Sequence, residues 1–466
     1  MDSRREFLKK AAMLSGGAGL SGLLPASIQR AFAINPELGS TYLDAEHVVI
    51  LMQENRSFDH CYGSLKGVRG FNDPRAITLP DKNPVWLQTN AAGQTYAPFR
   101  LNIKNSKSTW MGSLPHSWTD QTDARNKGKH DQWLISKKSG HKEYSEMPLT
   151  MGYHNREDIP FYYALADAFT VCDQNFCSSL AGTTPNRLYL WTGTVREQQD
   201  KDSYANVSNE NVNYSNVAHW KTFPEQLEDN SISWKIYQNE LSVGVDLEGE
   251  EDAWLSNFTD NPIEWFEQYH VKFLPAYVDF LPRKAVLIAD AIKKLEEKIQ
   301  TIPATDRATL MPLQRRLQQT QAALRTALAD QKIYTKENYE KLSAYHKSIH
   351  KKAFTTNTND PLYHELTTLK YKDGNTEREV QIPAGDVLHQ FREDVKTGNL
   401  PTVSWLVAPE NFSDHPGAPW YGTWYLSETM DILTKNPEVW KKTIFILAYD
   451  ENDGYFDHVP PFTVPN

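Results

Sequence analysis

Four short apolar runs, each bounded by polar or turn-forming residues, stand out along the 466-residue chain. They are His47–Met52 (HVVILM), Ser233–Tyr237 (SWKIY), Thr402–Val407 (TVSWLV) and Thr443–Tyr449 (TIFILAY). Two of them are nearly all apolar and rich in β-branched residues, which is typical of strands buried on both faces of a parallel sheet. Helical patterns lie between the runs, including Ile159–Ala168 and Tyr425–Leu433. Because strand and helix patterns alternate, we predict a doubly wound, mostly parallel α/β sheet.

A stretch at about residues 283–352 has a different pattern, with Leu and Ile at helical spacing among charged and Gln residues. One helical face would hold Ile288, Ile292, Leu295 and Ile299, and another would hold Leu313, Leu317, Leu324 and Leu328. Pro303 and Pro312 mark the break between the two helices. The pattern predicts an antiparallel helical hairpin, within a helical insertion at about residues 270–380. It carries no catalytic pattern, and we interpret it as a solvated packing appendage.

The N-terminus has the pattern of a twin-arginine export signal. Ser3–Lys9 reads SRREFLK, a mild apolar stretch follows, and Ala31–Ala33 (AFA) matches an A-x-A cleavage site. We therefore expect residues 1–33 to be a signal peptide handled by the twin-arginine export machinery. Residues 34–466 would form the main domain, and the protein would be periplasmic or extracellular. The chain stops soon after a candidate site loop, so we also expect the C-terminal part of this domain to be truncated.

Composition and charge narrow the class of partner. The chain has a formal net charge of −10, and removal of residues 1–33, with five basic and two acidic residues, leaves −13. An acidic body argues against nucleic acid and against anionic membranes held by charge alone, although it permits zwitterionic lipid. The three cysteines are too few for a disulfide scaffold or a cysteine-based zinc site. Whether Cys172 and Cys177 form a bridge is left open.

Acidic and amide side chains follow two of the predicted strands. Glu54 and Asn55 come after the first run, and Asp450 and Glu451 come after the last. Ligands of open α/β sheets bind beyond the carboxyl ends of the strands, so these residues would converge there. Three converging carboxylates repel one another unless a cation lies between them, and carboxylate and amide oxygens suit hard divalent ions. One such pair would be read as a capped, solvated loop, whereas two pairs predict a metal site.

A candidate phosphoryl-binding turn lies at Ser178–Arg187, which reads SSLAGTTPNR. A small-residue turn that ends in Thr-Pro is typical of a helix start, with Pro185 at the first helical position. A hydroxyl there would face free backbone N–H groups and the positive end of the helix dipole. The alternative is that Thr183 and Thr184 only cap the helix. The local pattern does not decide between these two roles.

Longer stretches resemble a known family. Four of them carry the resemblance: HVVILMQENRSFDHCYGSLKGVRGFNDPRA, REDIPFYYALADAFTVCDQNFCSSLAGTTPNRLYLWTGT, LPTVSWLVAPENFSDHP and FILAYDENDGYFDHVPP. They are similar to the bacterial phosphocholine-preferring phospholipases C. Plant non-specific phospholipases C and the acid phosphatase A group look like more distant relatives. The resemblance runs from about residue 46 to the end and is interrupted near residues 240–385.

The resemblance implies an alkaline-phosphatase-like α/β fold and a set of site residues. It implies metal ligation by Glu54, Asn55, Asp450 and Glu451, the nucleophile at Thr183, and active-site histidines at His116 and His415. Asp457, His458 and Asn186 would hold the residues of this site in position. The metal would be a divalent cation, with Ca²⁺ and Zn²⁺ as the candidates.

The implied function is an exported phospholipase C with a phosphothreonine intermediate. It would cleave the glycerol-side phosphodiester of phosphatidylcholine-like lipids into diacylglycerol and a phosphorylated head group, with transient contact at a membrane surface and no role for nucleic acid. One alternative is an acid phosphatase of the same fold, which would hydrolyse phosphomonoesters. Another is a non-catalytic exported protein that binds metal or ligand, against which the presence of Thr183, both histidines and all four ligands argues.

Overall fold

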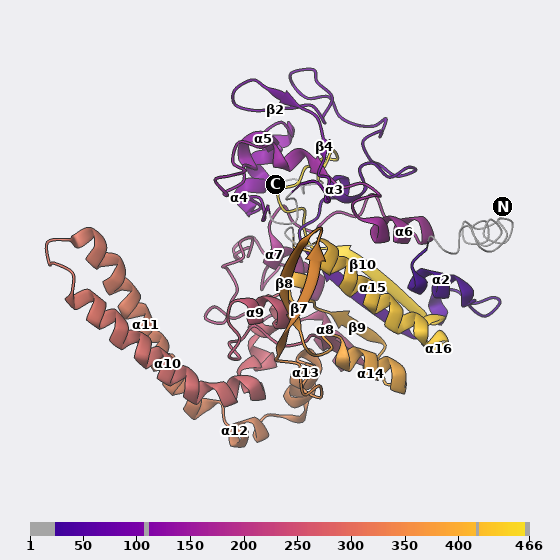
Figure 1. Cartoon of the computed structure of the whole chain (residues 1–466). Coiled ribbons are helices and arrows are strands. Elements are labelled where there is room, and N and C mark those ends of the chain that lie inside the picture. The colour runs from indigo at the N-terminus through magenta and orange to yellow at the C-terminus, as the bar shows by residue number, and fades with distance from the viewer. Residues whose placement is uncertain (1–23, 107–110, 416–418, 462–466) are drawn as a thin grey trace.

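A single parallel sheet organises the protein. The structure is a computed structural model and describes residues 24–106, 111–415 and 419–461, so the twin-arginine pattern lies outside the described residues (Figure 1). The four strands run parallel in the order β10-β1-β9-β6. Their bounds are Thr443–Tyr449, His47–Gln53, Val403–Leu406 and Trp234–Tyr237. Each of the four predicted strands is therefore present, and the α/β class is confirmed.

Helices cover both faces of this sheet, because successive side chains of each strand point to opposite sides. On β9, Leu406 packs into one core, while Val403 and Trp405 pack into the other. The first core is closed by α2 (Ala26–Ala33), α6 (Pro160–Ala168), α9 (Glu250–Leu255), α14 (His389–Thr397), α15 (Pro419–Lys435) and α16 (Pro437–Trp440). The second is closed by α7 (Thr183–Thr192), α8 (Phe223–Asp229) and α13 (Ala344–Ala353). The sheet is doubly wound, as predicted.

The register of β1 and β10 places the two acidic loops side by side. His47 lies opposite Thr443, and the pairing continues to Gln53 opposite Tyr449. The next backbone bond, from Asp450 N–H to the Gln53 carbonyl at 3.1 Å, continues the ladder into the loops. Glu54 and Asp450 are therefore neighbours at the carboxyl end of the sheet.

Strand β10 differs from the prediction that it is buried on both faces. It is the last strand of the described sheet, its residues are mostly half-buried, and Ile446 exposes 42% of its surface. The composition TIFILAY is that of a central strand, and composition does not report how many neighbours a strand has. A fully buried position was wrong for this strand.

A cap of short elements lies over the carboxyl ends of the strands, at the top of Figure 1. It contains α3 (Phe58–Tyr62), α4 (Trp118–Arg125), α5 (Trp133–Ser136), β2 (Gln88–Thr89), β3 (Thr95–Tyr96), β4 (Phe99–Arg100) and β5 (Gly152–Tyr153). Two small cores of its own hold it together, and both include residues from the segment after β10, namely Tyr455 and Phe456. The cap and the end of the described chain therefore form one unit over the sheet.

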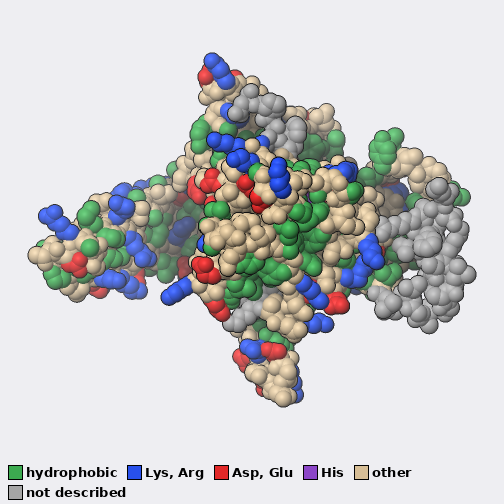
Figure 2. Space-filling model, turned by 90° about the horizontal axis from the view of Figure 1, so that it is seen from above, with side chains coloured by type: hydrophobic (Ala, Val, Ile, Leu, Met, Phe, Trp, Pro, Cys, Tyr) green, Lys and Arg blue, Asp and Glu red, His purple; other side chains and the backbone are tan. Residues whose placement is uncertain are grey.

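The predicted helical hairpin projects from the body as an arm of two long helices, α10 (Pro275–Gln300) and α11 (Arg307–Ile333). Figure 2 shows basic and acidic side chains interspersed along it, as a solvated appendage requires. Pro303 lies in the turn, but Pro312 lies inside α11, so its predicted role as a helix break was wrong. Pro312 is the sixth residue of α11, so it removes one intrahelical hydrogen bond near the start of a helix of 27 residues without ending it.

The insertion is also not helical throughout. After α12 (Lys336–Glu340) and α13, the chain forms an exposed antiparallel hairpin of β7 (Leu366–Asp373) and β8 (Thr376–Pro383). The predicted helical range of about 270–380 was therefore wrong at its C-terminal end. Gly374 has a φ of +60° in the tight turn that joins the two strands, a conformation that glycine adopts without strain.

The segment with the predicted cleavage site is helical. Helix α2 covers Ala31–Ala33, buries Ile28 and Ala31, and packs on α15, where Arg30 pairs with Asp431. Its removal by a signal peptidase stays a prediction. No helix in the described part of the chain combines the length and the apolar character that crossing a membrane requires. Short 3₁₀ helices complete the fold at Tyr42–Asp44, Asn126–Gly128, Leu149–Met151, Pro262–Trp265, Glu267–Tyr269, Val271–Phe273 and Glu410–Phe412.

Candidate active site

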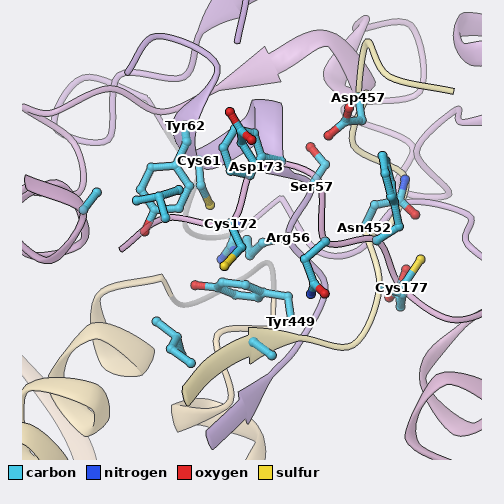
Figure 3. Close-up of a pocket in the computed structure, with 18 of the residues that line it drawn as sticks. Arg56, Ser57, Cys61, Tyr62, Cys172, Asp173, Cys177, Tyr449, Asn452 and Asp457 are labelled. Carbon is cyan, nitrogen blue, oxygen red and sulfur yellow. The ribbon is translucent and has the colours of Figure 1, made fainter. Parts of the chain in front are cut away.

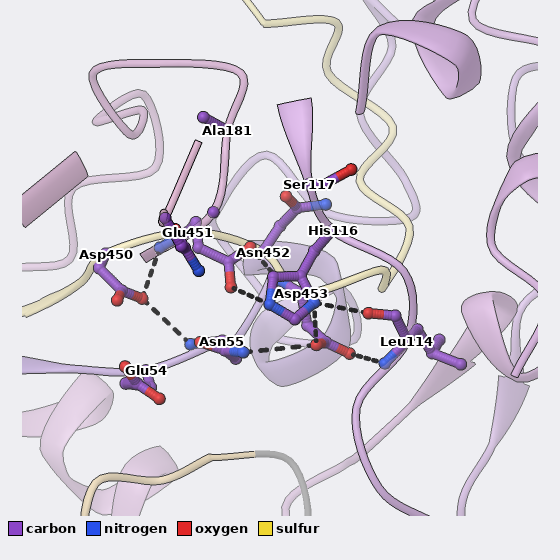
Figure 4. A network of polar contacts seen from close by, with 12 residues as sticks. Glu54, Asn55, Leu114, His116, Ser117, Ala181, Asp450, Glu451, Asn452 and Asp453 are labelled. Atoms are coloured by element: carbon purple, nitrogen blue, oxygen red, sulfur yellow. Dashed lines mark hydrogen bonds and ion pairs between the residues drawn. The ribbon is translucent and has the colours of Figure 1, made fainter. Parts of the chain in front are cut away.

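Four polar residues predicted as metal ligands meet at the carboxyl ends of β1 and β10 (Figure 4). Each of Glu54, Asn55, Asp450 and Glu451 exposes 2% of its surface or less. The backbone N–H groups of Asn55 and Glu451 both donate to Asp450 Oδ1, at 3.2 and 2.7 Å. Asn55 has a φ of 57°, a conformation that Asn tolerates better than most residues, and its amide donates to Asp453. These hydrogen bonds join the loop after β1 to the loop after β10.

One arginine faces several of these carboxylates. The guanidinium of Arg187, on α7, lies 3.0 Å from Asp450 Oδ2, 3.0 Å from Asp260 Oδ2 and 3.7 Å from Glu54 Oε1. Burial and the carboxylates of Asp260 and Asp450 raise the pKa of Glu54 well above its ordinary value. A single guanidinium cannot neutralise this many buried carboxylates, so the centre has a deficit of positive charge.

Several oxygens at this centre have no hydrogen-bond partner among the described residues. They are both carboxylate oxygens of Glu54, Asn55 Oδ1, Glu451 Oε1 and Asp260 Oδ1, and all are buried. A buried acceptor without a donor costs free energy, and native proteins rarely keep several in one place without a cation or water. The donor set of carboxylate and amide oxygens therefore fits a hard divalent cation.

His116 approaches the same centre from the segment before α4. Its Nδ1 lies 2.6 Å from the Leu114 carbonyl and 3.0 Å from Asp453 Oδ1, and its Nε2 lies 3.9 Å from Glu451 Oε1. Burial disfavours the imidazolium, but the carboxylates of Glu451 and Asp453 outweigh it and raise the pKa of His116 to about 10. His116, Glu451 and Asp453 lie close enough together to hold a metal ion.

A buried lysine fixes the segment that carries His116. Lys137 exposes 2% of its surface, and its Nζ donates to the Pro115 carbonyl at 2.8 Å and to Gln121 Oε1 at 2.9 Å. The Gln121 amide then donates to the side chain of Asn452 and to the Asp453 carbonyl. Burial, partly offset by Glu451, lowers the pKa of Lys137 to about 8. This network joins His116 to the acidic loop after β10.

Thr183 is the first residue of α7, so Pro185 is third and its predicted first position was wrong. Thr183 lies one helical turn before Arg187, and side chains four residues apart share a helix face. Because Arg187 bonds Asp450, the start of α7 faces the acidic centre. Asn186 holds the turn before the helix: its amide donates to the carbonyls of Ala181 and Gly182, both at 3.1 Å.

Gly182 brings that turn against His116. A Cβ at Gly182 would stand 3.4 Å from His116 Cδ2 and 3.2 Å from Asn209 Oδ1, so the two segments approach closely here. Asn209 accepts a hydrogen bond from the Thr184 N–H at 3.1 Å. Gly182 and Asn209 line a cavity of about 420 Å³, whose wall also contains His116, Trp118, Asp120 and Glu210.

His415 lies in the loop after β9 that Asp414 anchors. Asp414 Oδ2 accepts hydrogen bonds from the hydroxyls of Tyr162 and Tyr449, at 2.6 and 2.8 Å. Helix α15 approaches this anchor so closely that a Cβ at Gly422 would stand 2.7 Å from Asp414 Cβ. The His415 ring packs edge-on to Phe258. Burial, together with the charge of His116, lowers the pKa of His415 to about 4.

Asp457 and His458 lie in a neighbouring cluster rather than with the four predicted ligands. His458 Nδ1 lies 2.8 Å from Asp59 Oδ2, and its Nε2 lies 3.4 Å from Asp73 Oδ2. Asp457 accepts from the backbone N–H of Asp59. Asp59 belongs to α3, which follows Asn55, so this ion-pair network fastens the end of the described chain to the loop after β1.

A second cavity, of about 610 Å³, lies beside β10 and is lined by Tyr449, Glu451 and Asn452 (Figure 3). Cys172 and Cys177 also line it, and both are free thiols, as is Cys61. The bridge that the sequence left open is therefore absent from this structure. Burial raises the pKa of Cys177 to about 12, which makes it a poor nucleophile.

Three residues of the centre were missed by the sequence analysis. Asp453 belongs to the run DENDG and Arg187 to TTPNR, so both were adjacent to residues that were singled out. Their signal was the density of polar and charged residues after an apolar strand and at a helix start. Asp260 sits in no motif, and nothing in its sequence surroundings distinguishes it.

Known proteins share much of this sequence. The sequence pattern of the Phosphoesterase family matches residues 45–302 and 313–466. The chain is 35% identical to the non-hemolytic phospholipase C of Burkholderia pseudomallei, over 99% of this chain and 51% of that protein. It is 33% identical both to the non-hemolytic phospholipase C of Pseudomonas aeruginosa and to the hemolytic phospholipase C of the same organism. These matches cover 100% and 98% of this chain and 50% of each relative.

The matches also show how much of this chain and of its relatives is shared. The chain spans about half the length of these curated relatives. The family match continues through most of residues 240–385 and omits only residues 303–312, at the tip of the arm. The expectation of a long interruption was therefore wrong, and Asp260 lies within the matched region.

Proposed function

Because the chain belongs to the Phosphoesterase family, we propose that it is an exported phospholipase C. It would cleave the glycerol-side phosphodiester of phosphatidylcholine-like lipids and release diacylglycerol and a phosphorylated head group. The observation that carries the proposal is a set of buried oxygens, on Glu54, Asn55 and Glu451, for which the described part of the chain provides no hydrogen-bond partner. These oxygens lie beside the start of α7. The names of the relatives support phospholipids as the substrate class.

The proposed cation ligands are Glu54, Asn55, Asp450 and Glu451. A divalent cation there would withdraw charge from the phosphoryl oxygens and lower the pKa of a coordinated hydroxyl. Arg187 holds Asp450 in place and leaves the charge deficit for the cation to fill. Ca²⁺ and Zn²⁺ are the candidates, and the oxygen-only ligand set favours the harder ion.

Thr183 is the proposed nucleophile. Its hydroxyl loses its proton as its oxygen attacks phosphorus, the bond to the glycerol oxygen breaks in line with it, and a phosphothreonine that still carries the head group forms. The departing diacylglycerol takes a proton, and water then attacks the phosphothreonine and releases the phosphorylated head group. Of the two histidines, His116 is the better proton donor to the leaving oxygen, because the carboxylates of Glu451 and Asp453 raise its pKa to about 10 and keep the ring charged. His415 would stabilise developing charge from the side of β9.

The preference for a cationic head group is supported by the smaller cavity. Trp118, with 40% of its surface exposed, lines the cavity with Asp120 and Glu210. An aromatic face and carboxylates attract a quaternary ammonium, whereas they disfavour an anionic head group. Choline-like lipids are therefore the proposed substrates.

Export by the twin-arginine route is proposed from the pattern at residues 3–9. Folded proteins travel this route, which suits a centre that needs buried carboxylates and a cation assembled together. We likewise propose that residues 34–466 form one catalytic domain. The proposed mechanism depends neither on the export route nor on the domain bounds.

The test is a substrate panel on the purified chain, with and without a chelator. We expect phosphocholine and diacylglycerol from phosphatidylcholine, loss of activity with chelator, and recovery when a divalent cation is restored. Release of phosphate from p-nitrophenyl phosphate without any cleavage of phosphatidylcholine would assign the protein to the acid phosphatases instead. Tight cation binding without cleavage of either ester would make it a binding protein.

A further inference from the structure

Exposed aromatic and apolar side chains gather near the loop that carries His415. Trp420 and Trp424 lie one turn apart on α15 and expose 50% and 46% of their surface. Leu369 and Tyr371 lie two residues apart on β7, hence on one face of the hairpin, and expose 47% and 44%. We call these four residues the aromatic surface.

Ring contacts connect the aromatic surface to the site loop. The Trp424 ring lies 5.1 Å from that of Phe412, which is three residues before His415. Trp254 lies between Phe412 and Tyr421, with ring distances of 5.2 and 5.1 Å. Tyr371 is close enough to Tyr421 to add to the rise in pKa that burial causes there. The surface is therefore continuous with the loop of a candidate catalytic residue.

The chemistry of the aromatic surface selects its partner. Trp and Tyr combine a large apolar ring with a polar group and concentrate at the boundary between lipid and water. The β7–β8 hairpin has three basic residues (Lys370, Lys372, Arg378) and three acidic ones (Asp373, Glu377, Glu379), so it is neutral overall. The chain as a whole carries −10 and is repelled by an anionic bilayer. A zwitterionic lipid interface accepts the aromatic side chains and does not repel the negatively charged chain.

We propose that the aromatic surface docks the protein on the interface of zwitterionic bilayers. Docking there brings the His415 loop to the level of the lipid head groups, where the scissile ester lies. This inference deepens the proposed function and rests on it for the link between docking and catalysis, but vesicle binding itself requires no catalysis. Burial of the half-exposed rings provides the affinity, as in other interfacial proteins.

The test uses the double variant Leu369→Ser and Tyr371→Ser, both on an exposed strand. The matched control is Val286→Ser, an apolar residue on the arm with 68% of its surface exposed. We expect the double variant to bind phosphatidylcholine vesicles about tenfold more weakly in co-sedimentation, and to hydrolyse bilayer phosphatidylcholine slower by a similar factor. Hydrolysis of a short-chain phosphatidylcholine, kept monomeric in solution, stays within about twofold of the parent, as does every reading of the control.

The outcomes separate the two proposals. Unchanged vesicle binding in the double variant, or an equal loss in Val286→Ser, overturns the docking surface. Stronger binding of the parent to vesicles with added anionic lipid overturns the zwitterionic partner. A parent that binds vesicles but cleaves neither substrate refutes the phospholipase proposal and leaves docking intact. Tyr371→Ser alone, with a thermal melt equal to the parent, gives the same readings if the double variant fails to fold.

Discussion

Arg187 Nε donates to Asp450 Oδ2 at 3.0 Å, and this bond joins the helix that begins at Thr183 to the strand end that holds the acidic pair. The contact is between residues 263 positions apart, yet it sets the distance between the proposed nucleophile and the proposed cation ligands. The same guanidinium also bonds Asp260 through both its carboxylate and its carbonyl. Arg187 is therefore the common support of the centre.

Replacement of Arg187 by Met should destabilise the protein by about 3–5 kcal/mol, because the carboxylates of Asp450 and Asp260 would stay buried without their partner. A divalent cation should raise the melting temperature of this variant more than that of the parent, since it supplies the missing charge. Thermal melts with and without cation measure both effects. The control is Arg283→Met, which breaks an exposed pair with Asp246 and should cost under about 1 kcal/mol. Equal cation responses in parent and Arg187→Met would contradict the charge argument.

Replacement of Thr183 by Ala should reduce turnover by about three orders of magnitude or more, because the attacking hydroxyl is lost. The melting temperature and the cation affinity should stay near those of the parent, since Thr183 is only partly buried and the four proposed ligands remain. Thr183→Ser keeps a hydroxyl and should retain measurable activity. Acid quenching during turnover should trap the phosphorylated head group on the parent and on Thr183→Ser only. Near-normal activity in Thr183→Ala would remove it as the nucleophile.

The sequence predicted the strands of this fold well because their signal is local. Each of the four runs became a strand within about two residues, since apolar β-branched residues between turn signals have few other solutions. Long-range pairing has no such signal: β10 and β1 read alike, yet one is the last strand of the described sheet and the other lies inside it. The hairpin of β7 and β8 was missed because its strands are mostly exposed and mix apolar with charged residues.

The candidate site likewise has residues that the sequence predicted and residues that it did not. The four proposed ligands follow strands whose carboxyl ends must meet, so the fold class was enough to bring them together. Asp260 and Lys137 reach the centre from irregular segments, with no fixed distance along the chain to any motif. The role of a buried charge can be recognised only once its partners are known. For Lys137 that partner is the carbonyl of Pro115.

Replacement of Lys137 by Met should reduce kcat about tenfold with KM changed less, because the segment before His116 loses its tether while the cavity that His116 lines keeps its other walls. Lys138→Met, on the exposed neighbouring residue, is the control and should behave as the parent. A purely structural role would lower the melting temperature and leave the pH profile of kcat unchanged in shape. A displaced His116 shifts that profile. An unshifted profile with unchanged kcat would mean that Lys137 does not position His116.

Two buried histidines should make the protein sensitive to acid. His130 and His154 expose 1% and 3% of their surface, and burial lowers the pKa of each to about 4 from an unfolded value near 6.5. Between these pH values the unfolded chain binds more protons than the folded one, so stability rises with pH across the window. The stability that the two neutral histidines contribute is fully present above about pH 6.5 and is lost as the pH falls toward 4. Each histidine accounts for up to about 3 kcal/mol of that loss.

Urea unfolding at a series of pH values measures this slope directly. His130→Gln removes one of these titrations and should reduce the dependence of the unfolding free energy on pH between about 6.5 and 4, even if it lowers stability at neutral pH. The control is His141→Gln, at a histidine on the protein surface. The slope distinguishes titration from packing, since a cavity left by a truncated ring costs the same free energy at every pH. A parallel displacement of the whole curve in His130→Gln would therefore assign the loss to packing and contradict the protonation argument.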